Sequence, residues 1–213
     1  MNKKYILPIS LMLLVGITIF VSATMTVKTA NEKKYSISVE VYPGWNIISG
    51  VYPPQQISSG SEIEKEDIKA VWFYSPIEKE YIQIYPELDK TRLQDYDDEY
   101  VFSSSMWVYS EKQGTMLYDS IVYSDFPSLE TTQLISGWNF ITITSEMEGK
   151  SLNDLKGSCN IERAHIWYLV DNYWGTISLD SKIGIESIGM GSVIKVSSDC
   201  NLGEGGSSTT PPP

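Results

Sequence analysis

The chain has 213 residues, of which 42% are hydrophobic and 20% charged, and its formal net charge is −11 at neutral pH. This length suffices for one large domain or two small ones. An acidic surface repels phosphate backbones, so we expect no nucleic-acid partner. Such a charge is typical of a soluble or surface-displayed protein.

The N-terminus has the pattern of a secretory segment. Lys3 and Lys4 precede an apolar run over residues 5–21, and small residues follow it. Residues 1–23 are therefore predicted to be a signal peptide or a membrane anchor. The run is long for a signal peptide and slightly short for a spanning helix, so cleavage and retention both stay open. In either case the rest of the chain is expected outside the cell, and only residues 5–23 of an uncleaved chain would contact a membrane.

The tripeptide Gly-Trp-Asn occurs twice, at residues 44–46 and 137–139, each time followed by two apolar residues and Ser or Thr. A landmark that recurs at the start of two similar segments indicates two copies of one module. We predict a linker at 24–34, a first module at 35–123, a second module at 124–202 with the boundary near 124–128, and a Gly/Ser/Thr/Pro-rich tail at 203–213.

Short runs rich in Tyr, Trp, Ile and Val alternate with Gly, Pro, Ser and Asp, which is strand composition with turn punctuation. In the first module, strands are predicted over residues 36–42, 45–51, 70–74, 81–85, 106–109 and 115–118. In the second, they are predicted over residues 131–135, 138–144, 164–170, 173–178 and 193–196, with a hairpin turn at 171–172. The predicted fold is all-β with minor α: two related small β-barrel- or sandwich-like modules after an N-terminal hydrophobic helix.

Helical turns are predicted at one place in each module. Residues 61–64 fit a capping box, in which Ser is followed by Glu three residues later. Residues 151–155 occupy the matching place in the second module, and Gly157 supplies a stop.

When the repeat is aligned with itself, tryptophans coincide. The alignment matches Trp45 with Trp138, Trp72 with Trp167, and residues 106–110 with 193–197. Because these four tryptophans recur, they are predicted to be core anchors. The glycine and asparagine beside Trp45 and Trp138 are predicted to form turns, with the asparagine side chain bonded to backbone.

Other aromatic residues do not recur in this alignment. Trp107, Trp174, Tyr81 and Tyr85 are therefore the candidates for a ligand-binding face. Exposed tryptophan and tyrosine rings stack on the flat faces of sugars, so such a face indicates carbohydrate as a ligand.

The two cysteines, Cys159 and Cys200, both lie in the second module. An even count in a secreted chain favours a disulfide, and the alternative is a pair of free buried thiols. The only histidine, His165, cannot complete a zinc site with two cysteines, so no metal site and no cofactor are predicted.

An acidic loop precedes the last strands of the first module. Asp95, Asp97, Asp98 and Glu99 are candidate calcium ligands, because hard cations need several converging oxygens. The spacing of an EF-hand is missing, and the alternative is a solvated acidic loop.

The second copy has a recognisable layout. Gly-Trp-Asn leads a strand, a Trp-Tyr strand follows, and a Gly-rich turn enters the last strand, with cysteines at 159 and 200 flanking the latter two. This layout resembles a small β-module that recurs, often in tandem, in secreted and surface proteins of archaea and bacteria. The resemblance implies an extracellular structural or adhesive role. The chain departs from that module in the last strand, where Val193 and Ile194 replace the usual aromatic pair.

Catalysis finds little support in the sequence. His165 is expected within a strand, on the face opposite Ala164 and Ile166, and neither a nucleophile elbow nor a phosphate loop occurs. We therefore predict no catalytic residues and no enzymatic activity.

Three functions remain open. The first is a secreted or cell-surface structural or adhesive protein, and the second is a carbohydrate-binding protein that uses exposed Trp and Tyr. The third is a surface filament subunit packed through its N-terminal helix. The partner would be a surface polymer, a glycan or further copies of the chain.

Overall fold

The computed structural model describes the chain over residues 24–30, 32–49, 57–96, 100–101, 104–121 and 132–203. The predicted signal or anchor at 1–23, the boundary near 124–128 and the tail beyond Gly203 lie outside these residues, and those predictions stay predictions. Among the described residues, no helix is long and apolar enough to cross a membrane.

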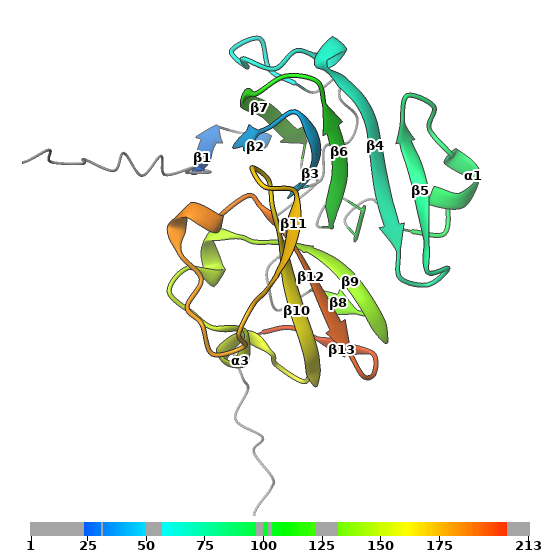
Figure 1. The fold of residues 1–213 in the computed structure, drawn as a ribbon, viewed down its shortest axis with the longest axis vertical. Helices are drawn as coiled ribbons and strands as arrows, with labels where there is room; N and C mark the ends of the chain where they lie inside the picture. Colours follow the sequence, from blue (N-terminus) through cyan, green and yellow to red (C-terminus); the bar gives the residue numbers. More distant parts are fainter. Residues whose placement is uncertain are drawn as a thin grey trace, which may run out of the picture.

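The first module is built from two antiparallel sheets (Figure 1). The main sheet has the order β3-β6-β4-β5, formed by Gly44–Ser49, Ser105–Ser110, Ile68–Ser75 and Glu80–Tyr85. The second sheet has the order β1-β2-β7, formed by Thr24–Ala30, Glu32–Val41 and Gly114–Ile121. Strand β1 and the start of β2 occupy the segment predicted as a linker, where the β-branched residues Thr24, Thr26, Val27 and Thr29 favour an extended strand.

The second module repeats this topology in a smaller form. Its main sheet has the order β9-β12-β10-β11, formed by Gly137–Thr142, Gly191–Val196, Ile161–Tyr168 and Tyr173–Thr176. A short ladder of β8 (Gln133–Leu134) and β13 (Cys200–Asn201) takes the place of β2 and β7. The same connections therefore recur in both modules, which confirms the predicted all-β fold of two related modules.

The described helical segments are all short: η2 (Lys65–Asp67), α1 (Lys90–Leu93), η4 (Ser145–Met147), α3 (Leu152–Leu155) and η5 (Ile185–Ser187). At α3, the Ser151 hydroxyl accepts from the N–H of Asp154, and the Asp154 carboxylate accepts from the N–H of Ser151. This capping box confirms the helix predicted at 151–155, and Gly157 follows it with a φ of +51°.

In the first module the capped turn begins later than predicted. Its N-cap is Glu64, whose N–H donates to the Asp67 carboxylate at 2.9 Å, and the turn is η2. The Ser61 hydroxyl instead accepts from the N–H of Ile63 and of Leu117, and so ties this loop to β7.

The hairpins β4–β5 and β10–β11 have the same loop. Each closes over four residues, and the last of them, Lys79 or Asn172, has a positive φ of 60° or 52°. The N–H of that residue donates to the carbonyl of Ser75 or Tyr168, at 2.8 and 2.9 Å. The hairpin turn predicted at 171–172 is confirmed as the second half of this loop.

These loops correct the alignment of the repeat. Counted back from them, Trp72 corresponds to His165, and Trp167 corresponds to Tyr74. The predicted match of Trp72 with Trp167 is therefore wrong by two residues. An irregularity at the same place in both strands, where they pair with β6 and β12, supports the corrected register.

The predicted alignment of the last strand is wrong by one residue. Trp107 pairs with Ile47 on β3, and Val193 pairs with Phe140, the counterpart of Ile47, on β9. Val193 is therefore the counterpart of Trp107. Since successive residues of a strand face opposite sides, this correction changes which residues share a face.

Each Gly-Trp-Asn forms the corner at which the chain enters its main sheet. Gly44 and Gly137 have φ angles of +104° and +111°, a conformation that glycine adopts without strain. The side chain of Asn46 is buried. Its Oδ1 accepts from the N–H of Tyr42 at 2.9 Å, and its Nδ2 donates to the carbonyl of Tyr42 at 2.9 Å.

Asn139 repeats these bonds. Its Oδ1 accepts from the N–H of Ile135 at 2.9 Å, and its Nδ2 donates to the carbonyl of Ile135 at 2.7 Å. The amide thus acts as the missing strand partner at the corner, where the backbone has none. This confirms the prediction that both asparagines bond to backbone.

The prediction that Trp45 and Trp138 are core anchors is wrong. Trp45 is 38% exposed, and Trp138 is half-buried. Because the asparagine beside each tryptophan points into the module, alternation along the strand directs the tryptophan to the opposite face of the sheet. The tryptophan recurs because both modules use that opposite face.

Alternation also separates the apolar residues into layers. In β3, Ile48 belongs to the core between the two sheets of the first module, whereas Ile47 faces the second module. In β9, Ile141 belongs to the core of the second module, whereas Phe140 faces the first. The first main sheet is therefore covered on both faces.

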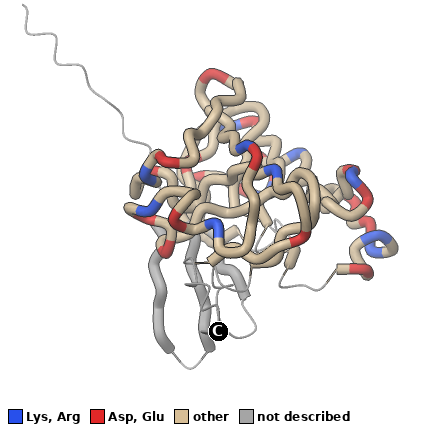
Figure 2. Tube along the Cα trace, turned by 90° about the horizontal axis from the view of Figure 1, so that it is seen from below, with Lys and Arg blue, Asp and Glu red and all other residues tan. Residues whose placement is uncertain are grey.

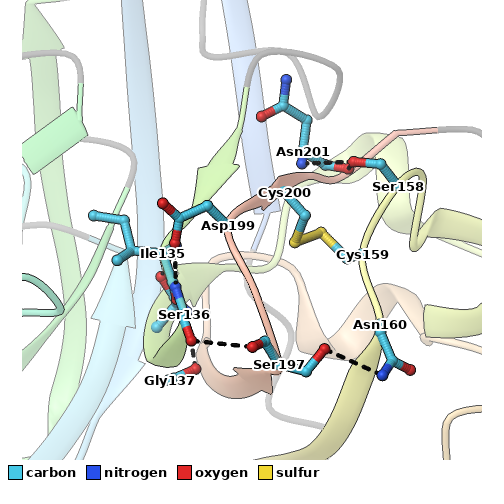
Figure 3. The surroundings of a disulfide bond; sticks show 11 residues. Ile135, Ser136, Gly137, Ser158, Cys159, Asn160, Ser197, Asp199, Cys200 and Asn201 are labelled. Carbon is cyan, nitrogen blue, oxygen red and sulfur yellow. Dashed lines mark hydrogen bonds between the residues drawn. A yellow bond between two sulfur atoms is a disulfide. The ribbon is translucent and has the colours of Figure 1, made fainter.

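The cysteines form the predicted disulfide, Cys159–Cys200, with a Cα–Cα distance of 5.0 Å. It ties the segment after α3 to β13, and hydrogen bonds flank it (Figure 3). The Ser158 hydroxyl accepts from the N–H of Asn201 at 3.0 Å, and Asp199 accepts from the N–H of Ser136 at 2.8 Å.

In the first module a carboxylate ties the loop before β4 to β7. The Glu62 side chain accepts from the N–H of Thr115 at 2.8 Å, and the N–H of Glu62 donates to the carbonyl of Thr115 at 2.9 Å. This hydrogen bond to the carboxylate is the main reason that the pKa of Glu62 is lowered.

We predict that Asn139→Ala destabilises the protein by about 2–4 kcal/mol, because it leaves the N–H and carbonyl of Ile135 without their partner. The measurement is urea unfolding followed by circular dichroism. The control is Asn160→Ala, which removes an exposed asparagine bonded to Ser197 and should change stability by less than about 1 kcal/mol. Equal effects of the two substitutions would contradict the assigned role of the corner.

We predict that replacing both Cys159 and Cys200 by Ala lowers the free energy of unfolding by about 2–4 kcal/mol, because the bridge restricts the unfolded chain. A reducing agent should lower the urea midpoint of the natural protein toward that of the double variant. The double variant is its own control and should not respond to the reducing agent. A response in the variant, or none in the natural protein, would show that the bridge does not stabilise the fold.

Candidate functional site

The main sheets of the two modules meet along a seam, with the first module above the second in Figure 1. In the two modules, β3 is equivalent to β9 and β6 is equivalent to β12. Strand β3 contacts β12, and the equivalent contact joins β6 and β9. Strand β3 also contacts β9, and β6 contacts β12, and each of these contacts is its own counterpart. Strand β4 also contacts β9, whereas its counterpart, β3 with β10, is not among the main contacts. The modules therefore meet through equivalent strands in an approximately two-fold arrangement.

The centre of the seam is apolar and close. Ile47, Phe140 and Val193 are buried there in one cluster. Gly191 on β12 allows a close approach, because a Cβ at this position would lie 2.2 Å from Cγ2 of Ile47 and 2.6 Å from Cβ of Ser105. A larger residue would therefore force the modules apart.

Polar and aromatic contacts flank this centre. The indole N–H of Trp167 donates to the carbonyl of Trp45 at 2.8 Å. On the other side of the axis, the ring of Tyr74, the counterpart of Trp167, lies 5.1 Å from that of Phe140. These contacts make the seam part of the folded structure rather than a loose junction.

A hollow of about 380 Å³ lies on the seam and is lined by Trp45, Trp72, Tyr81, Trp107 and Trp167. We call it the first hollow. The Trp107 ring lies 6.0 Å from that of Trp45 and 5.1 Å from that of Trp167, in nearly perpendicular planes. The indole N–H of Trp107 donates to the Tyr81 hydroxyl at 3.3 Å. The first hollow is thus a box of aromatic rings that hold one another in place.

A second hollow of similar volume, about 380 Å³, lies on the same seam. Its lining is Tyr74, Tyr81, Trp138, Phe140, His165, Trp174 and Val193. Under the module equivalence, Trp45, Trp72, Tyr81, Trp107 and Trp167 correspond to Trp138, His165, Trp174, Val193 and Tyr74. Every counterpart of the first lining therefore belongs to the second, and Tyr81 belongs to both.

Three of the four predicted ligand-face residues come together here. Tyr81 and Trp174 are 44% and 42% exposed, and the Trp107 ring lies 5.8 Å from that of Trp174. Tyr85 does not join them, since it packs against the core of the first module. The shift of register opposite Val71 places an extra residue in β5 and so turns Tyr85 to the other face.

The site also contains residues that the sequence prediction assigned elsewhere. Trp45, Trp72, Trp138 and Trp167 were expected in the cores because they recur, yet all four line the hollows. The signal that would have identified them is their alternation with a buried neighbour, such as Asn46 next to Trp45.

The second hollow differs from the first in carrying an imidazole. The His165 ring lies 5.6 Å from that of Trp138 and 6.4 Å from that of Trp174, and its Nδ1 is 3.4 Å from the Thr176 hydroxyl. Ala164 lies on the opposite face in the second core, as predicted. Burial, with a contribution from Tyr81, raises the pKa of the Tyr74 phenol.

The linings of the two hollows contain no lysine, arginine, aspartate or glutamate. The lining of the first hollow carries no formal charge at neutral pH. Figure 2 shows acidic and basic positions interspersed over the described surface. In the described part of the chain, no group of His, Cys, Asp and Glu could hold a metal ion. Of the calcium candidates, Asp95 is exposed, and Asp97, Asp98 and Glu99 lie outside the described residues.

Comparison with known proteins gives no further guide to the site. The chain matches no family model, no curated protein and no solved structure.

We predict that Gly191→Ala destabilises the protein by about 1–3 kcal/mol, because the added methyl group overpacks the seam. Urea unfolding gives the free energy, and tryptophan fluorescence reports the change at the seam. The control is Gly60→Ala, where the new Cβ would lie 3.6 Å from Leu117, an ordinary contact. If both substitutions have the same small effect, the seam is not tightly packed at Gly191.

Proposed function

We propose that this chain is a non-enzymatic adhesive protein of the cell exterior, and that it binds carbohydrate through the aromatic hollows of its seam. The observation that carries the proposal is the lining of the first hollow, which consists of four tryptophans and one tyrosine. Such rings offer flat apolar faces for stacking and few acid or base groups for bond cleavage.

The charge of the site favours a neutral ligand. The first hollow is uncharged, while the whole chain carries a formal charge of −11. An anionic ligand would be repelled by the protein and would find no cation in this lining. Neutral sugars combine apolar ring faces with hydroxyl groups, and they fit the pairing of stacking rings with polar atoms such as the Tyr81 hydroxyl.

The exterior location is supported by the disulfide. The Cys159–Cys200 bridge is compatible with an oxidising environment outside the cell. Adhesion requires a surface that is accessible in the folded protein, and Trp45, Tyr81 and Trp174 are all exposed at the hollows. The folded seam holds these rings at fixed positions, which lowers the entropy lost when a ligand binds.

We predict that Tyr81→Ala weakens binding of a neutral glycan by about tenfold or more, because Tyr81 lines both hollows. An array of neutral glycans identifies the ligand, and titration followed by tryptophan fluorescence gives Kd for each variant. Urea unfolding establishes that the variants are folded.

The matched control is Tyr168→Ala. Tyr168 is also 44% exposed, but it stacks on Tyr173, 4.8 Å away, and does not line either hollow. This variant should bind like the natural protein. The proposal fails if no neutral glycan binds, or if Tyr168→Ala weakens binding as much as Tyr81→Ala does.

A further inference from the structure

The two hollows are joined by a continuous row of rings. Successive ring centroids lie 6.0 Å apart from Trp45 to Trp107, 5.8 Å from Trp107 to Trp174, 6.4 Å from Trp174 to His165 and 5.6 Å from His165 to Trp138. The row begins in the first hollow and ends in the second. It crosses from one module to the other between Trp107 and Trp174.

Tyr81 is common to both linings. It touches the first hollow through the hydrogen bond from Trp107, and it reaches the second through its contacts with Tyr74 and Phe140, at 5.3 and 6.1 Å. With 44% of its surface exposed, it is open to a ligand where the two hollows meet. Tyr81 therefore lies at the boundary between the two hollows and belongs to the lining of both.

We infer that the two hollows are subsites of one extended site, which takes a linear, neutral oligosaccharide running across the seam. This inference rests on the proposed function. Consecutive sugar rings of such a chain would contact consecutive members of the row, and Tyr81, which belongs to both linings, makes the two subsites adjacent.

The subsites differ in chemistry. The first is lined by aromatic rings alone, whereas the second has the His165 imidazole and the Val193 side chain where the first has Trp72 and Trp107. Stacking contacts dominate the first subsite, and a hydrogen-bonding group is added in the second. The site consequently distinguishes the two ends of a bound chain.

The test uses the whole protein and β-1,4-linked oligomers of glucose and of N-acetylglucosamine, from the monosaccharide to the hexasaccharide. Isothermal titration calorimetry gives the affinity and the number of ligands bound per chain. Since filling a second linked subsite is an intramolecular step, we expect affinity to rise by about a hundredfold or more between short and long oligomers. One long oligomer should bind per chain.

Two variants separate the subsites. Trp45→Ala removes an exposed ring that lines only the first hollow, and Trp174→Ala removes one that lines only the second. Each should weaken the binding of the longest oligomer by about tenfold. The control is Tyr173→Ala, an exposed tyrosine next to Trp174 that lines neither hollow and should leave affinity unchanged.

Two other results would overturn the inference in distinguishable ways. Binding of two long oligomers per chain, with an affinity independent of length, would mean that the hollows are separate sites, although the proposed function would stand. A lack of binding at every length would overturn the proposed function and this inference together.

Discussion

The buried amides of Asn46 and Asn139 fix the corner at which each module turns into its main sheet. Once the asparagine is held inside, the alternation of the strand leaves the preceding tryptophan no place in the core. Trp45 and Trp138 are thereby directed to the outer face of their sheets. The aromatic seam, the contact of the modules and both hollows follow from this one choice of direction.

The sequence predicted the strands other than β1 and β13, the duplication, the α3 helix and the disulfide, because these depend on local patterns and on cysteine count. It did not predict the register between strands, which is set by pairing with residues far away in the chain. The alignment of the two copies was wrong by two residues at Trp72. Because a shift of two residues keeps a side chain on the same face of the sheet, Trp72 and Trp167 were still assigned to the same face. The alignment of the last strand was wrong by one residue, and a shift of one residue exchanges the two faces of a strand. This error concealed the equivalence of Trp107 and Val193.

Burial on the outer face could not be read from the sequence either. Ile47 and Ile48 are both buried, although they face opposite sides of β3, because a second module covers the first sheet. In the sequence such a strand looks like a continuous apolar run. The apolar run alone therefore does not separate core residues from seam residues, and the direction of Trp45 is indicated only by its alternation with the buried Asn46. The bulge in β5, which separates Tyr85 from Tyr81, leaves no clear sequence signal.

The two-fold character of the seam bears on how the chain arose. A face that packs against its own equivalent is a surface by which a single module would form a homodimer. Joining two such modules in one chain turns a concentration-dependent association into an intramolecular one. It also allows the sequences of the two modules to diverge. The two modules now differ at equivalent positions: Ser105 is the counterpart of Gly191, and Trp72 is the counterpart of His165. The subunits of a homodimer have identical sequences and cannot differ in this way.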